Sequence, residues 1–180
     1  RKVERPFDSL AHTFFSILYT AAPFSLFPFA AFNQTGLDPL FQMKGVEFSP
    51  GIPVGFFLLL WTNDTGAYLV GSLAGKHRLF ERISPKKSWE GFIGGLLLTV
   101  LVALLIGGWL GVADNTGWMI IAVIISIAGT AGDLLESMLK RSLGLKDSGT
   151  ILPGHGGFLD RFDSVVVSFP LVYLYIAISA

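Results

Sequence analysis

The sequence has no cysteine and few charged residues. Because cysteine is absent, nothing in the sequence indicates disulfides or a redox compartment. Only 14% of the 180 residues are charged, which is too few to cover a soluble domain. A hydrophobic content of 52% and a mean hydropathy of +0.62 instead indicate an integral membrane protein.

The sequence also lacks internal repeats, low-complexity tracts and linkers, so we interpret residues 1–180 as a single membrane domain. It begins at Arg1, with neither an initiator Met nor a small-residue cleavage site. We therefore expect no signal peptide and interpret the chain as a fragment of a longer protein.

Five apolar stretches each approach the ~20 residues that a hydrocarbon core of ~30 Å requires. They cover residues 9–32, 52–73, 89–111, 117–136 and 164–180. We therefore predict an all-α polytopic bundle with about five transmembrane helices. Pro23 and Pro28 are expected to kink or break the first helix.

The cations are distributed unequally. If the five segments alternate across the membrane, 12 of the 13 Lys and Arg residues lie on one side, and only Lys44 lies on the other. The positive-inside rule assigns the cation-rich side to the cytoplasm. We therefore expect a multi-pass protein of the cell membrane, with cytoplasmic loops at about 74–88 and 137–163.

Carboxylates within apolar segments are costly, which makes them candidates for function. Asp64 lies near the middle of the second segment and shares a helix face with Gly71 and Gly75. We expect this small-residue face to point into the bundle, and an interhelical hydrogen bond is the alternative role for Asp64. Asp133 ends the fourth segment and begins a polar stripe that continues through Glu136, Ser137 and Lys140. The alternative for Glu136 and Lys140 is an ordinary i,i+4 ion pair.

Asp160 and Asp163 flank Arg161 just before the last apolar run. Either acid could be a helix cap. Two acids beside a cation are more typical of a divalent-metal site, with Arg161 directed at a phosphate oxygen. The preceding loop contains His155, Gly156 and Gly157, and its backbone N–H groups could hold phosphate. His155 could orient a phosphate, or it could instead stabilise the loop.

Two further groups of cations have an alternative explanation in topology alone. Lys140, Arg141 and Lys146 stand in the predicted cytoplasmic loop, where the positive-inside rule expects cations. Ser84 and Ser88 are potential caps of the third helix, and Lys86 and Lys87 between them could bind a lipid phosphate or merely anionic headgroups.

The stretch from Ser137 to Asp163 resembles the signature of the phosphatidate cytidylyltransferases. It reads Ser, two residues, Lys-Arg, four residues and Lys-Asp, followed after a short spacer by Pro, one residue, His-Gly-Gly, two residues, Asp-Arg, one residue and Asp. About a dozen fixed positions make the match specific. Residues 64–68 and 84–95 resemble further motifs of this family, whose members carry additional N-terminal helices.

The resemblance implies a catalytic domain that uses Mg²⁺ to transfer CMP from CTP to phosphatidic acid, giving CDP-diacylglycerol and pyrophosphate. It implies Mg²⁺ ligation by Asp133 and Asp160, with Asp163 or Asp64 supporting. The catalytic residues would be Asp133, Asp160, Asp163, Lys140 and Arg141. The substrate-binding residues would be Ser84, Lys86, Lys87, Lys146, Asp147, His155, Gly156, Gly157 and Arg161. We expect no nucleic-acid partner, and a homodimer is left open.

Two other functions remain. A transporter or channel would also bury Asp64 and Asp133, but it would not need so many cations and acids gathered on one side. Another enzyme using CTP on an isoprenoid or ether lipid would share the same motifs, because lipid choice depends on cavity shape.

Overall fold

The computed structural model describes residues 6–32, 48–110, 113–142, 144, 157 and 159–179. Within them lie five helices: α1 (Pro6–Phe32), α2 (Gly51–Ala74), α3 (Trp89–Leu110), α4 (Asn115–Ser142) and α5 (Leu159–Ser179). Two short strands, β1 (Arg78–Phe80) and β2 (Ser84–Ser88), join α2 to α3. The predicted all-α membrane bundle is confirmed, with this hairpin as an addition.

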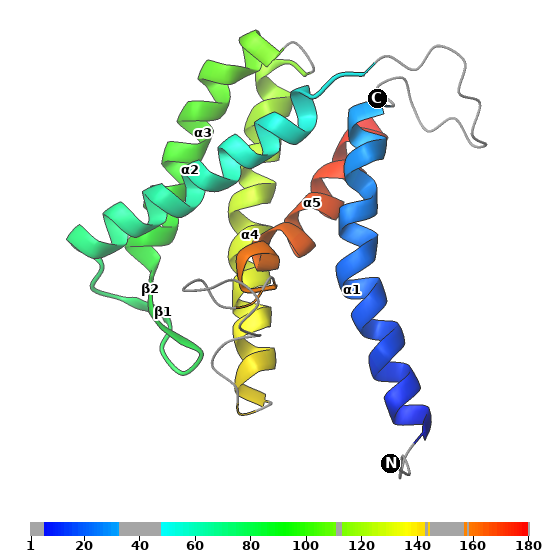
Figure 1. Cartoon of the computed structure of the whole chain (residues 1–180). Coiled ribbons are helices and arrows are strands. Elements are labelled where there is room, and N and C mark those ends of the chain that lie inside the picture. Colours follow the sequence, from blue (N-terminus) through cyan, green and yellow to red (C-terminus); the bar gives the residue numbers. More distant parts are fainter. Residues whose placement is uncertain are drawn as a thin grey trace.

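The helices pack in sequential pairs around α4. α2 lies along α3, and α4 contacts both α3 and α5 (Figure 1). α1 packs on α5 with its C-terminal half, and its N-terminal half projects away from the other helices. The fully buried side chains of Phe56, Trp118, Ile121, Val165 and Phe169 form the centre of the core.

Four helices, α1, α3, α4 and α5, are long and apolar enough to cross a membrane. α2 forms over the predicted second segment, but it is not one of these four. Its middle contains the polar run 62–65, which lowers its hydropathy. Because the span count rests on α2, the five-span topology stays a prediction.

The helix bounds differ from those of the apolar segments. α1 is continuous through Pro23 and Pro28, so neither proline breaks the helix. α4 continues to Ser142 and α5 begins at Leu159, so the helices extend into both ends of the predicted loop 137–163. Polar residues can continue a helix beyond its apolar segment, and hydropathy alone does not detect this.

Small residues allow α2 and α3 to approach closely, and Gly71 of the predicted packing face is one of them. A Cβ on Gly91 would lie 2.7 Å from the carbonyl oxygen of Ala67 and 3.1 Å from the Cα of Gly71. Ser88 caps α3, since its Oγ accepts a hydrogen bond from the Gly91 N–H at 3.1 Å. Ser84 does not cap that helix, because it pairs with Phe80 in the antiparallel hairpin.

Candidate active site

A cavity of about 580 Å³ opens between α2, the hairpin, α3 and α4. Small residues of α2 and α3 form much of its wall and leave room for a ligand. Its charged lining residues are Asp64, Arg78, Lys86, Lys87 and Asp133. The predicted face of α2 that bears Asp64, Gly71 and Gly75 thus borders this cavity.

Asp133 connects α4 to the hairpin. Its Oδ2 lies 2.5 Å from the Lys87 Nζ, and both side chains are partly exposed to the cavity. Asp133 is also within electrostatic range of Asp64 on α2 and Asp163 on α5. Acids from three helices and a cation from β2 therefore lie around Asp133, and Asp64, Lys87 and Asp133 itself line the cavity.

Lys140 joins the end of α4 to the start of α5. Its Nζ lies 2.5 Å from Glu136 Oε2 and 2.6 Å from Asp160 Oδ1. The Glu136 side chain is 0% exposed, so Lys140 compensates a buried carboxylate. The polar stripe on α4 and its i,i+4 ion pair are thereby confirmed, but the same cation also holds Asp160 in place.

The position of Asp163 depends on Gly132, which was not among the predicted site residues. A Cβ on Gly132 would lie 2.6 Å from the Asp163 carbonyl oxygen and 3.2 Å from the Cα of Ser164. Only a residue without a side chain lets the first turns of α5 approach α4 so closely. Its location directly before Asp133 was the available signal.

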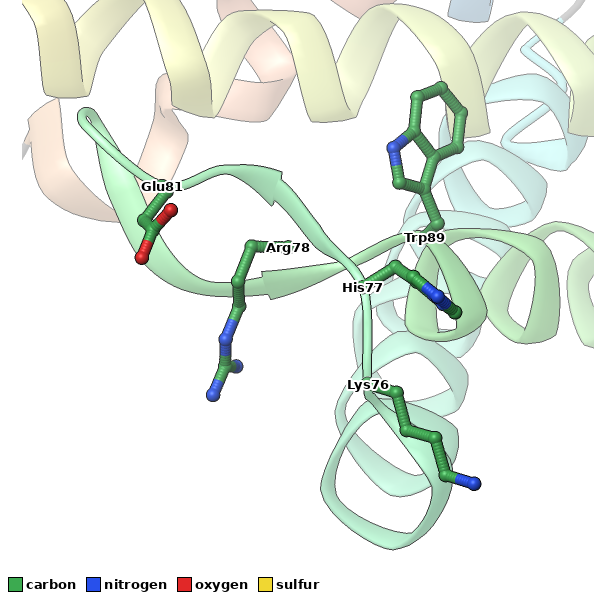
Figure 2. A pocket seen from close by; sticks show the side chains of 5 residues that line it. All are labelled: Lys76, His77, Arg78, Glu81 and Trp89. Atoms are coloured by element: carbon green, nitrogen blue, oxygen red, sulfur yellow. The ribbon is translucent and has the colours of Figure 1, made fainter.

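A second hollow lies on the outer side of the hairpin, lined by Lys76, His77, Arg78, Glu81 and Trp89. Figure 2 shows that these side chains point in different directions and do not converge on one point. We therefore place the candidate site in the cavity that contains Asp133, where charges of both signs face one another.

A family model described as "Cytidylyltransferase family" matches residues 1–179. The chain belongs to the cytidylyltransferase family.

Three similar relatives are named phosphatidate cytidylyltransferase. The one from Staphylococcus epidermidis is 49% identical over 118 residues, that from Staphylococcus haemolyticus is 50% identical and that from Staphylococcus aureus is 51% identical. Each match covers 64% of this chain and 45% of the relative. The chain therefore spans less than half of the length of these cytidylyltransferases.

The remaining predicted site residues are partly inside and partly outside the described part of the chain. Lys140, Glu136 and Asp160 form what we call the Lys140 cluster. Arg141, in the last turn of α4, and Arg161, in the first turn of α5, are exposed and adjoin it in the chain. The Gly157 N–H donates to Asp160 Oδ2 at 2.8 Å, so in this arrangement it binds a carboxylate instead of a phosphate. Four predicted residues lie outside the described part of the chain: Lys146, Asp147, His155 and Gly156.

The carboxylates suit a hard divalent cation in their chemistry, although none of the described residues form a group of three His, Cys, Asp or Glu able to hold one. Mg²⁺ commonly takes only one or two protein carboxylates and fills its shell with water and phosphate oxygens. Asp133, with Asp64 and Asp163 in electrostatic range, matches that pattern. Asp160 already accepts contacts at both oxygens, from Lys140 and Gly157.

Proposed function

We propose that the protein transfers CMP from CTP to phosphatidic acid at the membrane, giving CDP-diacylglycerol and pyrophosphate. The observation that carries this proposal is the cavity in which Lys86, Lys87 and Arg78 face Asp64 and Asp133 inside a membrane bundle. Cations there suit phosphate groups, and acids suit a metal that accompanies a triphosphate. The names of the family and of the similar relatives support the same reaction.

The reaction needs no protein nucleophile. An oxygen of the phosphatidic acid phosphate is already an anion and attacks the α-phosphorus of CTP. The bond from that phosphorus to the bridging oxygen breaks, and pyrophosphate leaves with the electron pair. The protein can therefore act mainly by aligning two phosphates and neutralising their charge.

We assign the cations to two substrates by their positions. Lys86 and Lys87 on β2 stand at the start of the candidate span α3, where a lipid phosphate at the membrane interface can reach them. Lys140, Arg141 and Arg161 gather where α4 ends and α5 begins, and we propose that they bind the triphosphate. His155, Gly156, Lys146 and Asp147 stay predicted substrate contacts.

Mg²⁺ is the proposed cofactor. Asp133 and Asp160 would hold it, with Asp163 or Asp64 supporting. When bound, it would draw negative charge from the α-phosphate and from the departing pyrophosphate. A metal at Asp160 would have to replace the contact from Lys140 or that from Gly157.

We also propose that the site faces the cytoplasm of a cell-membrane protein, because the cation-rich segments flank it. A homodimer stays a prediction, which light scattering of the purified protein would test.

The test is incubation of the full-length parent protein with labelled CTP, Mg²⁺ and a panel of lipid phosphates. We expect a labelled CDP-lipid from phosphatidic acid that depends on Mg²⁺. A product formed only from an isoprenoid or ether lipid phosphate would replace the proposed substrate, and the absence of any CTP-dependent product would refute the proposed function.

A further inference from the structure

Glu90, in the first turn of α3, binds the backbone at the base of the hairpin. It accepts hydrogen bonds from the Lys76 N–H at 3.1 Å and from the His77 N–H at 3.2 Å. Its Oε1 also lies 2.6 Å from the His77 Nδ1. The Trp89 N–H completes the connection by donating to the His77 carbonyl oxygen at 3.0 Å. One carboxylate thus fixes the point where the chain enters the hairpin.

The hairpin needs such an anchor because it is short. Its strands have three and five residues, and their pairing contains an irregularity between Arg78 and Phe80. A two-stranded ribbon of this size is at best marginally stable alone. Figure 2 shows His77 beside the start of α3, with Arg78 and Glu81 farther out along the hairpin.

Among the described residues, the cations that line the cavity come from the hairpin: Arg78, Lys86 and Lys87. Lys87 reaches Asp133 on α4 at 2.5 Å. Glu90 itself does not line the cavity. The hairpin base that Glu90 binds therefore offers a route by which Glu90 can affect the cavity.

We infer that Glu90 is a positioning residue for the transfer reaction: it holds the base of the hairpin so that Lys87 faces Asp133 and the cavity. This inference rests on the proposed function. Glu90 does not line the cavity and is not one of the acids paired with Lys140. Its bonds to Lys76 and His77 account for an acid close to the cations of residues 76–78 and 86–87.

The test is a double-mutant cycle on the full-length parent protein, combining Glu90→Ala with Lys87→Gln. We expect Glu90→Ala to lower kcat/KM by ~10 to 100-fold, as loss of a supporting contact does in other sites. If Glu90 acts through Lys87, Lys87→Gln should cost much less in the Glu90→Ala background than in the wild type. Glu90→Gln keeps the size of the side chain and one acceptor, so its kcat/KM should lie between those of the wild type and Glu90→Ala. It keeps the inference testable if the alanine variant misfolds.

Glu81→Ala is the matched control, because it removes the same charge from the exposed turn of the same hairpin. It should leave kcat/KM within about twofold of the wild type. Fold losses for Glu90 and Lys87 that simply multiply would overturn the inference, because a general structural defect would behave in that way.

Hydrogen exchange separates this inference from the proposed function. Glu90→Ala should speed exchange of the Lys76 and His77 amides and of the β1–β2 amides at least tenfold, whereas Glu81→Ala should not. Unchanged exchange would overturn the positioning role whether or not the protein makes a CDP-lipid. A wild-type protein that makes no CDP-lipid would refute the function alone.

Discussion

The carbonyl oxygen of Asp163 lies over Gly132, at a distance of 2.6 Å from where a Cβ on that glycine would be. This contact sets how closely α5 crosses α4 beside the candidate site. It brings Asp163 into electrostatic range of Asp133, the residue that follows the glycine. The packing of two helices and the grouping of two acids thus depend on one missing side chain.

Replacing Gly132 with alanine should therefore disturb both packing and function. The added methyl group meets backbone atoms, which cannot move as easily as a flexible side chain. We expect a loss of ~1 to 3 kcal/mol in the free energy of unfolding, together with reduced CDP-lipid formation. Thermal unfolding in detergent and a turnover assay measure the two effects.

Gly108→Ala is the control for this prediction, because a Cβ there meets nothing within 4 Å. Alanine is a better helix former than glycine, so Gly108→Ala should keep or slightly raise stability. Equal behaviour of the two variants would contradict the role given to Gly132.

Asp133→Asn and Asp160→Asn should each abolish turnover and leave membrane insertion intact. Asparagine keeps the size of the side chain but loses the charge that is proposed to hold Mg²⁺. In the structure that charge is paired with Lys87 at Asp133 and with Lys140 at Asp160. CDP-lipid formation over a range of Mg²⁺ concentrations is the measurement. Near-normal rates in both variants would remove these acids from the metal site.

Asp114→Asn provides the matched control for these acids. Asp114 caps the start of α4 by accepting the Gly117 N–H at 2.7 Å, and asparagine caps a helix equally well. It stands at the opposite end of α4 from Lys140, so its loss of charge should not alter turnover.

Lys140→Ala and Arg141→Ala should differ in stability although both weaken use of CTP. Each is expected to lower kcat/KM for CTP by ~10 to 10³-fold if the pair binds the triphosphate. Lys140→Ala should also destabilise the fold by about 3 kcal/mol, because it leaves the buried Glu136 without its cation. Arg141 is exposed, so its loss should change stability little.

Kinetics against CTP concentration and unfolding in detergent test this pair. A fully active Lys140→Ala protein would contradict the triphosphate role, and a fully stable one would contradict its role as counter-ion to Glu136.

Labelling of single cysteines tests the topology without interference, since the chain has no cysteine of its own. A cysteine at Ser84 in the hairpin should react from the cytoplasm, and one at Asn115, at the start of α4, should react from the other side. Labelling of both from the same side would contradict the five-span arrangement.

The sequence by itself determined the class of the protein and the location of its helices. Low charge and long apolar runs leave a membrane bundle as the stable solution, because backbone groups in lipid must bond within a helix. The spacing of Gly71 and Gly75 also correctly predicted a packing face on α2, against which Gly91 of α3 lies. These features are local, so they can be recognised from residues near one another in the chain.

Only the tertiary structure decided which charges meet. Lys87 pairs with Asp133 and Lys140 with Asp160 across segments that helical periodicity does not relate. The hairpin was not predicted from the sequence, and Ser84 lies in one of its strands instead of capping α3. Its eleven residues include few of the apolar side chains from which strands are recognised. Nothing in the sequence indicated the bonds from Glu90 to Lys76 and His77, which exist only because α3 begins beside the base of the hairpin. Partner choice among charges depends on distance in the folded chain, which the packing of the helices sets.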